Sequence, residues 1–140
     1  MRTAMLVLVL CIWCPSCPAE VQELDFEPYV YKARVVSVYD ADTVTLDIDL
    51  GFNVRTTQKI RLYGINTWEI RGPEKPKGII ARNWLREQIL GAPVFLRTHK
   101  DKQGKYGRYL GTLYKRGHNG DWVDLNHRLI ELGHGVTYNP

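Results

Sequence analysis

Three short stretches of the chain carry polar residues whose types and spacing could perform chemistry on a phosphate group. They are the turn DADT (40–43), the stretch RLYGINTWE (61–69) and the stretch KYGR (105–108). Each stretch lies where an expected strand begins or ends, and functional side chains commonly occupy such positions on a rigid scaffold. In the second stretch, an arginine, an asparagine and a carboxylate fall within nine residues beside a strand that otherwise reads as buried.

Hydrolysis of a phosphodiester needs groups of these kinds. Two guanidiniums can bind a phosphate with bidentate, permanently charged donors, and Arg61 and Arg108 suit this role. A carboxylate such as Glu69 can take a proton from the attacking water. A hard divalent cation held by oxygen ligands can neutralise charge, and Asp42, Asn66 and a nearby backbone carbonyl could hold it. The combination therefore indicates a site for phosphoryl chemistry.

Each of these residues also has a purely structural explanation that the sequence leaves open. Asp42 could be a turn residue, because aspartate side chains bind their neighbouring backbone. Arg61 could pair with Asp47 or Asp49 across a sheet. Glu69 could be an ordinary loop carboxylate, and KYGR could be the basic tip of a hairpin. The functional interpretation depends on their occurring together.

Periodicity predicts the elements that must position these side chains. Alternating apolar residues and helical spacing place strands at 31–40, 43–50, 59–65, 93–100 and 108–116, and helices at 79–90 and 124–133. Residues 51–58 are expected to be a connector and residues 70–78 a Pro/Gly-rich loop. Five strands, with one helix after the third and one at the end, predict a mainly β (α+β) fold, a five-stranded OB-fold barrel. A five-stranded α+β sandwich is the alternative.

Together these elements resemble the thermonuclease, or staphylococcal-nuclease-like, family. The matching stretches cover about residues 30–137 in the family's order: VVSVYDADTVTL, KIRLYGINTWE, GPEKPKGIIARNWLREQI, DKQGKYGRYLGTLY and LNHRLIELGHG. The resemblance implies an OB-fold barrel with about three helices. It also implies a calcium-dependent nuclease that acts on DNA and RNA.

The resemblance further implies roles for individual residues. Arg61 and Arg108 match the two phosphate-clamping arginines, and Glu69 matches the glutamate assigned as general base. The positions that match nucleotide-contacting residues are Lys105 and Tyr106, with Tyr138 as a candidate for the family's stacking tyrosine.

The implied metal site departs from the family at one ligand. Asp42 matches a calcium-ligating aspartate and Thr67 the threonine whose backbone carbonyl joins the metal shell, but Asn66 stands where the family has a second aspartate. Asparagine keeps the oxygen and loses the charge, so calcium should bind more weakly. Because Glu69 and both arginines are retained, we expect an active nuclease with a weakened Ca²⁺ site. The alternative is a non-catalytic OB-fold module that binds nucleic acid.

Two further departures flank these ligands. Ala41 replaces a glycine of the family's turn, which is tolerable unless the position needs a positive φ. Trp68 replaces a proline before the glutamate, and its side chain could either stack on a base or pack on the barrel.

The N-terminus reads as a secretory signal peptide over residues 1–19. A short positive start precedes the apolar run MLVLVLCIW, which is too short to span a membrane, and small residues follow with cleavage expected near Ala19. Cys11, Cys14 and Cys17 have a spacing typical of iron–sulfur ligation, yet the chain has no fourth cysteine. The residues before each cysteine fit a lipobox poorly, which disfavours a lipoprotein anchor. We therefore expect a secreted or periplasmic protein with no stable membrane partner.

Charge is distributed unevenly along the remaining chain. Residues 20–29 form an acidic lead-in, whereas residues from Pro28 onward include 18 basic and 11 acidic side chains, a formal charge of +7. Such a balance favours a phosphate-bearing partner. We therefore expect one thermonuclease-like domain over residues 30–140. It should be a monomer that cleaves DNA and RNA and prefers single strands.

Overall fold

The computed structural model describes residues 29–103 and 107–139. The expected signal peptide and nearly all of the acidic lead-in lie outside these residues. So do Lys105 and Tyr106, two of the predicted nucleic-acid contacts.

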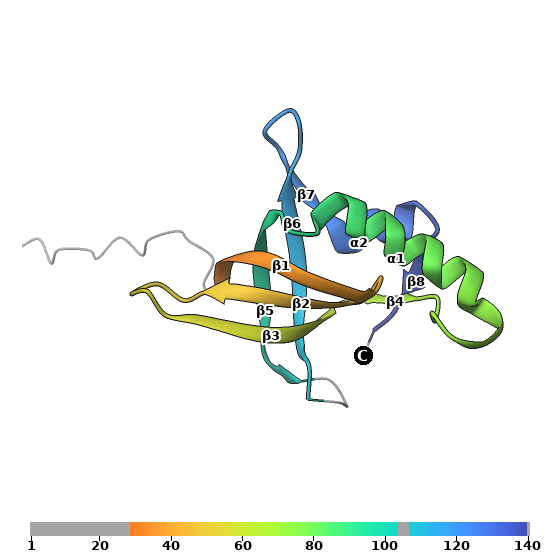
Figure 1. The fold of residues 1–140 in the computed structure, drawn as a ribbon, viewed down its shortest axis with the longest axis horizontal. Coiled ribbons are helices and arrows are strands. Elements are labelled where there is room, and N and C mark those ends of the chain that lie inside the picture. The colour runs from red at the N-terminus through yellow and green to blue at the C-terminus, as the bar shows by residue number, and fades with distance from the viewer. Residues whose placement is uncertain (1–28, 104–106, 140) are drawn as a thin grey trace, which may run out of the picture.

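A closed barrel of five strands forms the body of the domain (Figure 1). Its strands are β1 (Val30–Asp40), β2 (Thr43–Asp49), β3 (Arg55–Leu62), β5 (Pro93–Gln103) and β6 (Tyr109–Arg116). β1, β2 and β3 form the predicted antiparallel meander, and β5 lies between β1 and β6. The barrel closes where β6 pairs in parallel with β3, with Leu110 opposite Arg61. This pairing confirms the mainly β, OB-type barrel and excludes the sandwich.

The interior of the barrel follows the alternation seen in the sequence. Along β2, Val44, Leu46 and Ile48 are buried, while Thr45 and Asp47 between them are half-exposed. Burying one face of each strand removes apolar surface from water and fixes the register, because a slip of one residue would turn that face outward.

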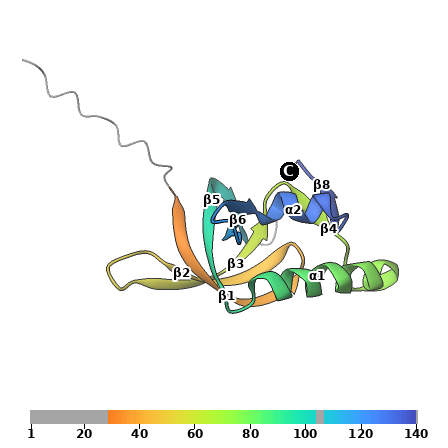
Figure 2. The ribbon, with the colours of Figure 1, turned by 90° about the horizontal axis from the view of Figure 1, so that it is seen from above.

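The hairpin between β2 and β3 differs from expectation, because β3 begins at Arg55 inside the predicted connector. The first residues of β3 bury no apolar side chain, so alternation gave no signal there. Antiparallel pairing with β2 extends to Asp49 opposite Arg55, and exposed ion pairs accompany it. Arg55 Nε donates to Asp47 Oδ2 at 3.0 Å, and Arg55 Nη1 lies 3.6 Å from Asp49 Oδ2. The hairpin projects away from the helices (Figures 1 and 2).

The described residues contain two α-helices and one 3₁₀ turn, rather than about three helices. The 3₁₀ turn η1 (Gly72–Glu74) leads into α1 (Lys75–Ile89), and α2 is Leu125–Glu131. α1 begins within the expected loop because Pro76 is in its first turn, where a missing N–H breaks no helical hydrogen bond. No helix in the described part of the chain is long and apolar enough to cross a membrane.

Three short strands were not predicted: β4 (Ile65–Thr67), β7 (Trp122–Asp124) and β8 (Gly135–Thr137). Three residues are too few to show an alternating pattern. The expected strand 59–65 is interrupted because Gly64 has a φ of +76°, which turns the chain between β3 and β4. β4 then pairs with β8, which places Asn66 opposite Val136.

Asn126 of α2 attaches the C-terminal helix to the barrel. Its side chain accepts a hydrogen bond from Leu113 N at 3.2 Å and donates to Tyr63 O at 2.9 Å and Gly111 O at 3.1 Å. All three backbone groups lie near the junction of β3 and β6. This buried amide therefore holds β8, and through it β4, at the end of the barrel where the polar stretches meet.

Candidate active site

A cleft of about 970 Å³ brings the predicted residues together. It is lined by Ser37, Tyr39, Asp40, Asp42, Thr43, Thr45, Lys59, Arg61, Asn66, Glu69, Arg71 and Arg108. These residues come from β1, β2 and the turn between them, from β3 and β4, from the loop after β4 and from the segment before β6. The fold thus joins the polar stretches at 40–43 and 61–69 with Arg108 of the third.

Arg61 lies at the centre of the contacts in this cleft. Its Nη1 forms an ion pair with Asp42 Oδ2, and its Nη2 donates to Asn66 Oδ1 at 2.9 Å. Asp47 and Asp49 are instead partners of Arg55. The alternative in which Arg61 pairs across the sheet with those two aspartates is therefore wrong.

Asp42 is buried, with 5 % of its surface exposed. Besides Arg61, its Oδ2 accepts a hydrogen bond from Thr67 N at 3.0 Å, across 25 positions of sequence. Its Oδ1 accepts from the Thr43 hydroxyl at 3.2 Å. Asp42 is therefore more than a turn residue, because it joins the β1–β2 turn to both β3 and β4.

Thr43 links the first and third polar stretches. The hydroxyl that donates to Asp42 also accepts a hydrogen bond from Arg108 Nη1 at 2.8 Å. This hydroxyl thereby connects the buried carboxylate to the second predicted phosphate-binding arginine. Sequence reasoning did not single out Thr43 as a site residue, and a threonine following an aspartate gave no signal of such a bridge.

Three charged residues also line the cleft without having been predicted. Lys59 precedes Arg61 by two residues on β3, so strand alternation could have placed both on one face. Arg71 follows Glu69 by two residues in the loop. Burial raises the pKa of the Asp40 carboxyl, while a hydrogen bond with Thr43 and the nearby arginines oppose this shift.

The charges in the cleft also affect Arg61. Burial lowers the pKa of its guanidinium, and the positive charge of Arg108 lowers it further. Asp40, Glu69 and Tyr138 act in the opposite direction. Two guanidiniums that repel each other in a partly buried cleft are stabilised when an anion such as a phosphate lies between them.

Trp68 packs within the domain beside this cleft. Its Nε1 donates to Gly133 O at 3.2 Å, and Lys77 Nζ lies 4.9 Å from the ring centroid. These contacts favour packing over base stacking for this side chain. Ala41 is fully buried and is not among the described residues with positive φ, so alanine is compatible with the turn.

A comparison with protein families supplies an independent observation. A family model described as "Staphylococcal nuclease homologue" matches residues 59–139, which is 81 of the 140 residues. The chain belongs to this family. The family resemblance expected from the sequence is thereby confirmed. The residues matched by the staphylococcal nuclease homologue model include Arg61, Asn66, Glu69 and Arg108. Asp42 precedes the matched residues and joins the site through its contacts with Arg61, Thr43 and Thr67.

Other comparisons add little about function. No curated protein matches the chain. Among solved structures, the human TDRD1 extended Tudor domain in complex with a symmetrically dimethylated peptide matches with a TM-score of 0.44 and 14% identity. The match covers 81% of this chain and 68% of that one.

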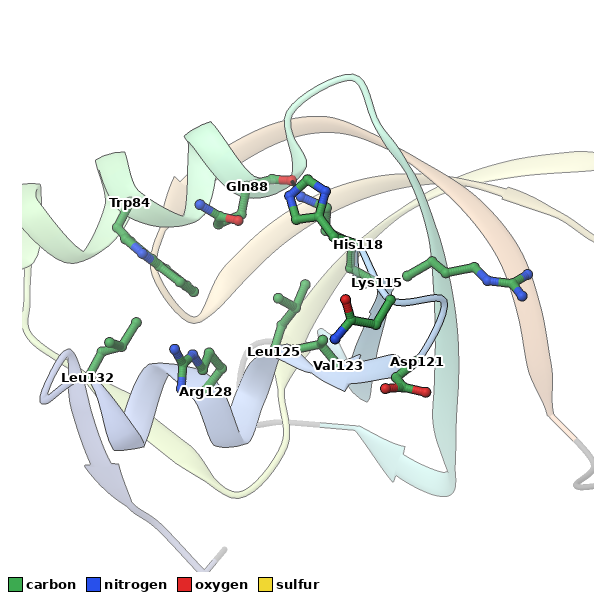
Figure 3. Close-up of a pocket in the computed structure, with 12 residues that line it drawn as sticks. Trp84, Gln88, Lys115, His118, Asp121, Val123, Leu125, Arg128 and Leu132 are labelled. Atoms are coloured by element: carbon green, nitrogen blue, oxygen red, sulfur yellow. Dashed lines mark hydrogen bonds between the residues drawn. The ribbon is translucent and has the colours of Figure 1, made fainter.

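A second cavity, of about 690 Å³, lies between α1, α2 and the β6–β7 turn (Figure 3). Trp84 and Gln88 reach it from α1, Arg128 reaches it from α2, and Leu132 reaches it from the residue after α2. Lys115 Nζ donates to Gln88 O at 2.7 Å and so ties β6 to the end of α1. Of the predicted site residues that the structure describes, none lines this cavity.

Proposed function

We propose that this chain is a metal-dependent nuclease that hydrolyses the phosphodiester bonds of DNA and RNA. The observation that carries the proposal is the cleft in which Arg61, Arg108 and Glu69 meet around the buried Asp42. Any one of these residues has an ordinary structural explanation. Their convergence from distant segments in a staphylococcal nuclease homologue is what favours catalysis.

The two arginines would bind the scissile phosphate and the charge that develops on it. Asn66 Oδ1 and Asp42 hold the Arg61 guanidinium, and Thr43 holds that of Arg108. These contacts fix the guanidinium planes before substrate arrives. Preorganised donors stabilise a transition state because they need no reorganisation during the reaction.

Glu69 would act as the general base. Its side chain is exposed and lines the same cleft, so water can reach it. The carboxylate takes a proton from a water molecule and the water oxygen forms a bond to phosphorus. By analogy with the family, the bond that breaks is the one from phosphorus to the 5′ oxygen. The leaving oxygen gains a proton from solvent, and the products are a 3′-phosphate and a 5′-hydroxyl.

The oxygen donors at this site fit a hard cation such as Ca²⁺. Asp42, Asn66 and the Thr67 carbonyl would hold it, and Ca²⁺ would supply charge neutralisation and an oriented water. Within the described residues, no group of three or more His, Cys, Asp or Glu side chains is placed to hold a metal. Arg61 also bridges Asp42 and Asn66 and would compete with a cation. This competition supports a weak site.

The proposal extends to where the protein acts, its oligomeric state and the form of its substrate. The protein would act outside the cytoplasm, secreted or periplasmic, as a monomer without a stable membrane partner. An open cleft lined by Lys59, Arg61, Arg71 and Arg108 suits a flexible single strand, whose phosphates can reach the cations.

A second candidate is a non-catalytic module that holds nucleic acid with the same basic cleft. The Arg61–Asn66 hydrogen bond favours it, because an arginine seated between the two metal ligands opposes metal entry. The intact Glu69 and the pair of clamping arginines favour the nuclease.

One assay separates the two candidates. The purified protein and its Glu69→Gln variant are incubated with heat-denatured DNA, in calcium or in chelator. We expect cleavage by the unmodified protein in calcium alone. Cleavage that persists in chelator and in the Glu69→Gln variant would rule out the proposed mechanism. Tight binding without cleavage in any metal would favour the binding module.

A further inference from the structure

An aromatic groove lies on the outer face of the barrel, at β5, β6 and β7. We define this outer groove by the residues that line it: Val30, Phe95, Arg97, Tyr114 and Trp122. Its volume is about 390 Å³. It shares no residue with the proposed active cleft.

Strand register explains why these side chains gather. Phe95 on β5 is opposite Tyr114 on β6, and opposite residues of an antiparallel pair point to the same face. Trp122 on β7 joins them, with its ring centroid 4.8 Å from that of Phe95 in an edge-on arrangement. Trp122 is nevertheless 51 % exposed. A large aromatic surface thus stays open to solvent on a rigid sheet.

Cations surround the aromatic side chains of the outer groove. Arg97 lines it, and Lys32 is opposite Phe95 on β1. The Arg116 guanidinium lies 5.5 Å from the Trp122 ring centroid. Asp124 is opposite Tyr114, but its carboxylate accepts a hydrogen bond from His127 N and caps α2. Three cations against this one carboxylate give the rim of the outer groove a net positive charge.

These charges select among possible ligands. An aromatic cage for a methylated lysine or arginine needs aromatic faces that a cation can approach. Here the positive charges of Arg116 and Lys32 beside the rings would repel a second cation. Open aromatic rings beside cations instead suit a single nucleic-acid strand, because bases stack on the rings and phosphates meet the cations.

We infer that the outer groove is a second binding site for single-stranded nucleic acid, in which a base stacks on Trp122. The inference rests on the proposed function for its choice of ligand, but it does not require catalysis. Such a site would hold a strand while another part of it occupies the cleft.

The spacing between the two sites sets a minimum length for a strand that spans them. Arg108 of the cleft and Tyr114 of the outer groove are six residues apart along extended chain. At ~3.3 Å per residue this separation is roughly 20 Å. A strand with a stacked rise of ~3.4 Å per nucleotide covers this separation with about six nucleotides, and a strand whose bases are unstacked covers it with fewer.

The test measures binding of fluorescein-labelled dT12 to the full chain by fluorescence anisotropy. Every protein carries Glu69→Gln, and a gel verifies that the strand remains intact. Trp122→Ala is compared with Trp122→Phe, which retains a ring for stacking. The matched control is Phe52→Ala, because Phe52 is fully exposed in the β2–β3 turn, outside the outer groove. Circular dichroism establishes that each variant is folded.

We expect Trp122→Ala to raise the Kd for dT12 about tenfold, as the loss of one base–aromatic stack would. Trp122→Phe should retain most of the affinity, and Phe52→Ala all of it. The effect of Trp122→Ala should be smaller for dT2, which is too short to span both sites. Lys32→Glu leaves the rings in place and should weaken dT12 binding while flattening its dependence on salt.

An unchanged Kd in both Trp122→Ala and Lys32→Glu would overturn the inference, as would equal losses in Trp122→Ala and Phe52→Ala. A dimethylarginine peptide that binds the outer groove while dT12 does not would also overturn it. Failure of the proposed function is distinct from these results. If the unmodified protein cleaves nothing, the binding measurements still decide whether the outer groove holds a strand.

Discussion

Gly78 of α1 lies directly against the backbone of Glu69. A Cβ built on Gly78 would stand 2.3 Å from Glu69 O and 2.7 Å from Trp68 O, closer than a real Cβ approaches backbone atoms. The absence of a side chain therefore lets the helix approach the segment that carries the proposed general base. α1 in turn is anchored to β1, because Arg86 Nη2 donates to Val38 O at 2.9 Å.

Gly78→Ala should lower kcat for DNA cleavage by about tenfold or more, because a displacement of ~1 Å can cost up to about a hundredfold. In an exposed helix the same change would stabilise the protein by about 0.5–1 kcal/mol. Here the contact with Glu69 predicts instead that Gly78→Ala lowers the free energy of unfolding. Urea unfolding and cleavage kinetics measure the two effects.

Glu87→Ala is the control for this prediction, because Glu87 is an exposed residue of the same helix. It should leave both kcat and the free energy of unfolding nearly unchanged. A Gly78→Ala protein that is more stable and fully active would show that the helix adjusts without moving Glu69.

Asn66→Asp should lower the calcium concentration at which cleavage is half-maximal. The change restores a negative charge among the oxygen donors, and calcium affinity rises with the number of charged ligands. The new carboxylate would also strengthen the contact with Arg61 Nη2, which partly offsets the gain. Calcium titrations of the cleavage rate measure the midpoint, and an unchanged midpoint would remove Asn66 from the metal shell.

Thr43→Val should reduce kcat/KM by about tenfold. Valine fills a similar volume but removes the hydroxyl that joins Asp42 to Arg108, leaving the buried carboxylate and the half-buried guanidinium without that partner. Thr43→Ser retains the hydroxyl and serves as the control. Equal activity of the valine and serine variants would show that Arg108 is held in place by other contacts.

Asp40→Asn should make the protein more stable at pH 7 in the presence of chelator. Burial raises the pKa of Asp40 above its ordinary value of 3.8, so the folded state binds this proton more tightly than the unfolded state. Unmodified protein therefore loses stability as pH rises from about 3.8 through the raised pKa. Asparagine cannot ionise, so the variant lacks this loss.

Urea midpoints of both proteins across this pH range test the prediction. The variant should match the unmodified protein below pH 3.8 and exceed it at pH 7. A difference in urea midpoint between the two proteins that does not vary with pH would contradict the prediction, as would a variant that is less stable at pH 7.

Much of the fold could be predicted from local pattern. Alternation along β2 identified Val44, Leu46 and Ile48 as core residues, and the interval between strands indicated the barrel. The residue types at 42, 61, 69 and 108 indicated phosphate chemistry, because few side chains can clamp a phosphate or activate water. The inferences about the fold succeeded because they depend on neighbours in sequence. The inference of phosphate chemistry rests on the chemistry of single side chains and stays a prediction.

Long-range pairing decided the rest. Only the closed barrel shows that Arg61 binds Asp42 rather than Asp47, since strand register selects among chemically identical partners. From the sequence alone, Gly78 is a residue that destabilises a helix. The close approach of the Glu69 backbone explains why a glycine stands there. The outer groove has no sequence signature either, because Phe95, Tyr114 and Trp122 come from three strands. Such contacts depend on how distant segments meet, which local periodicity does not encode.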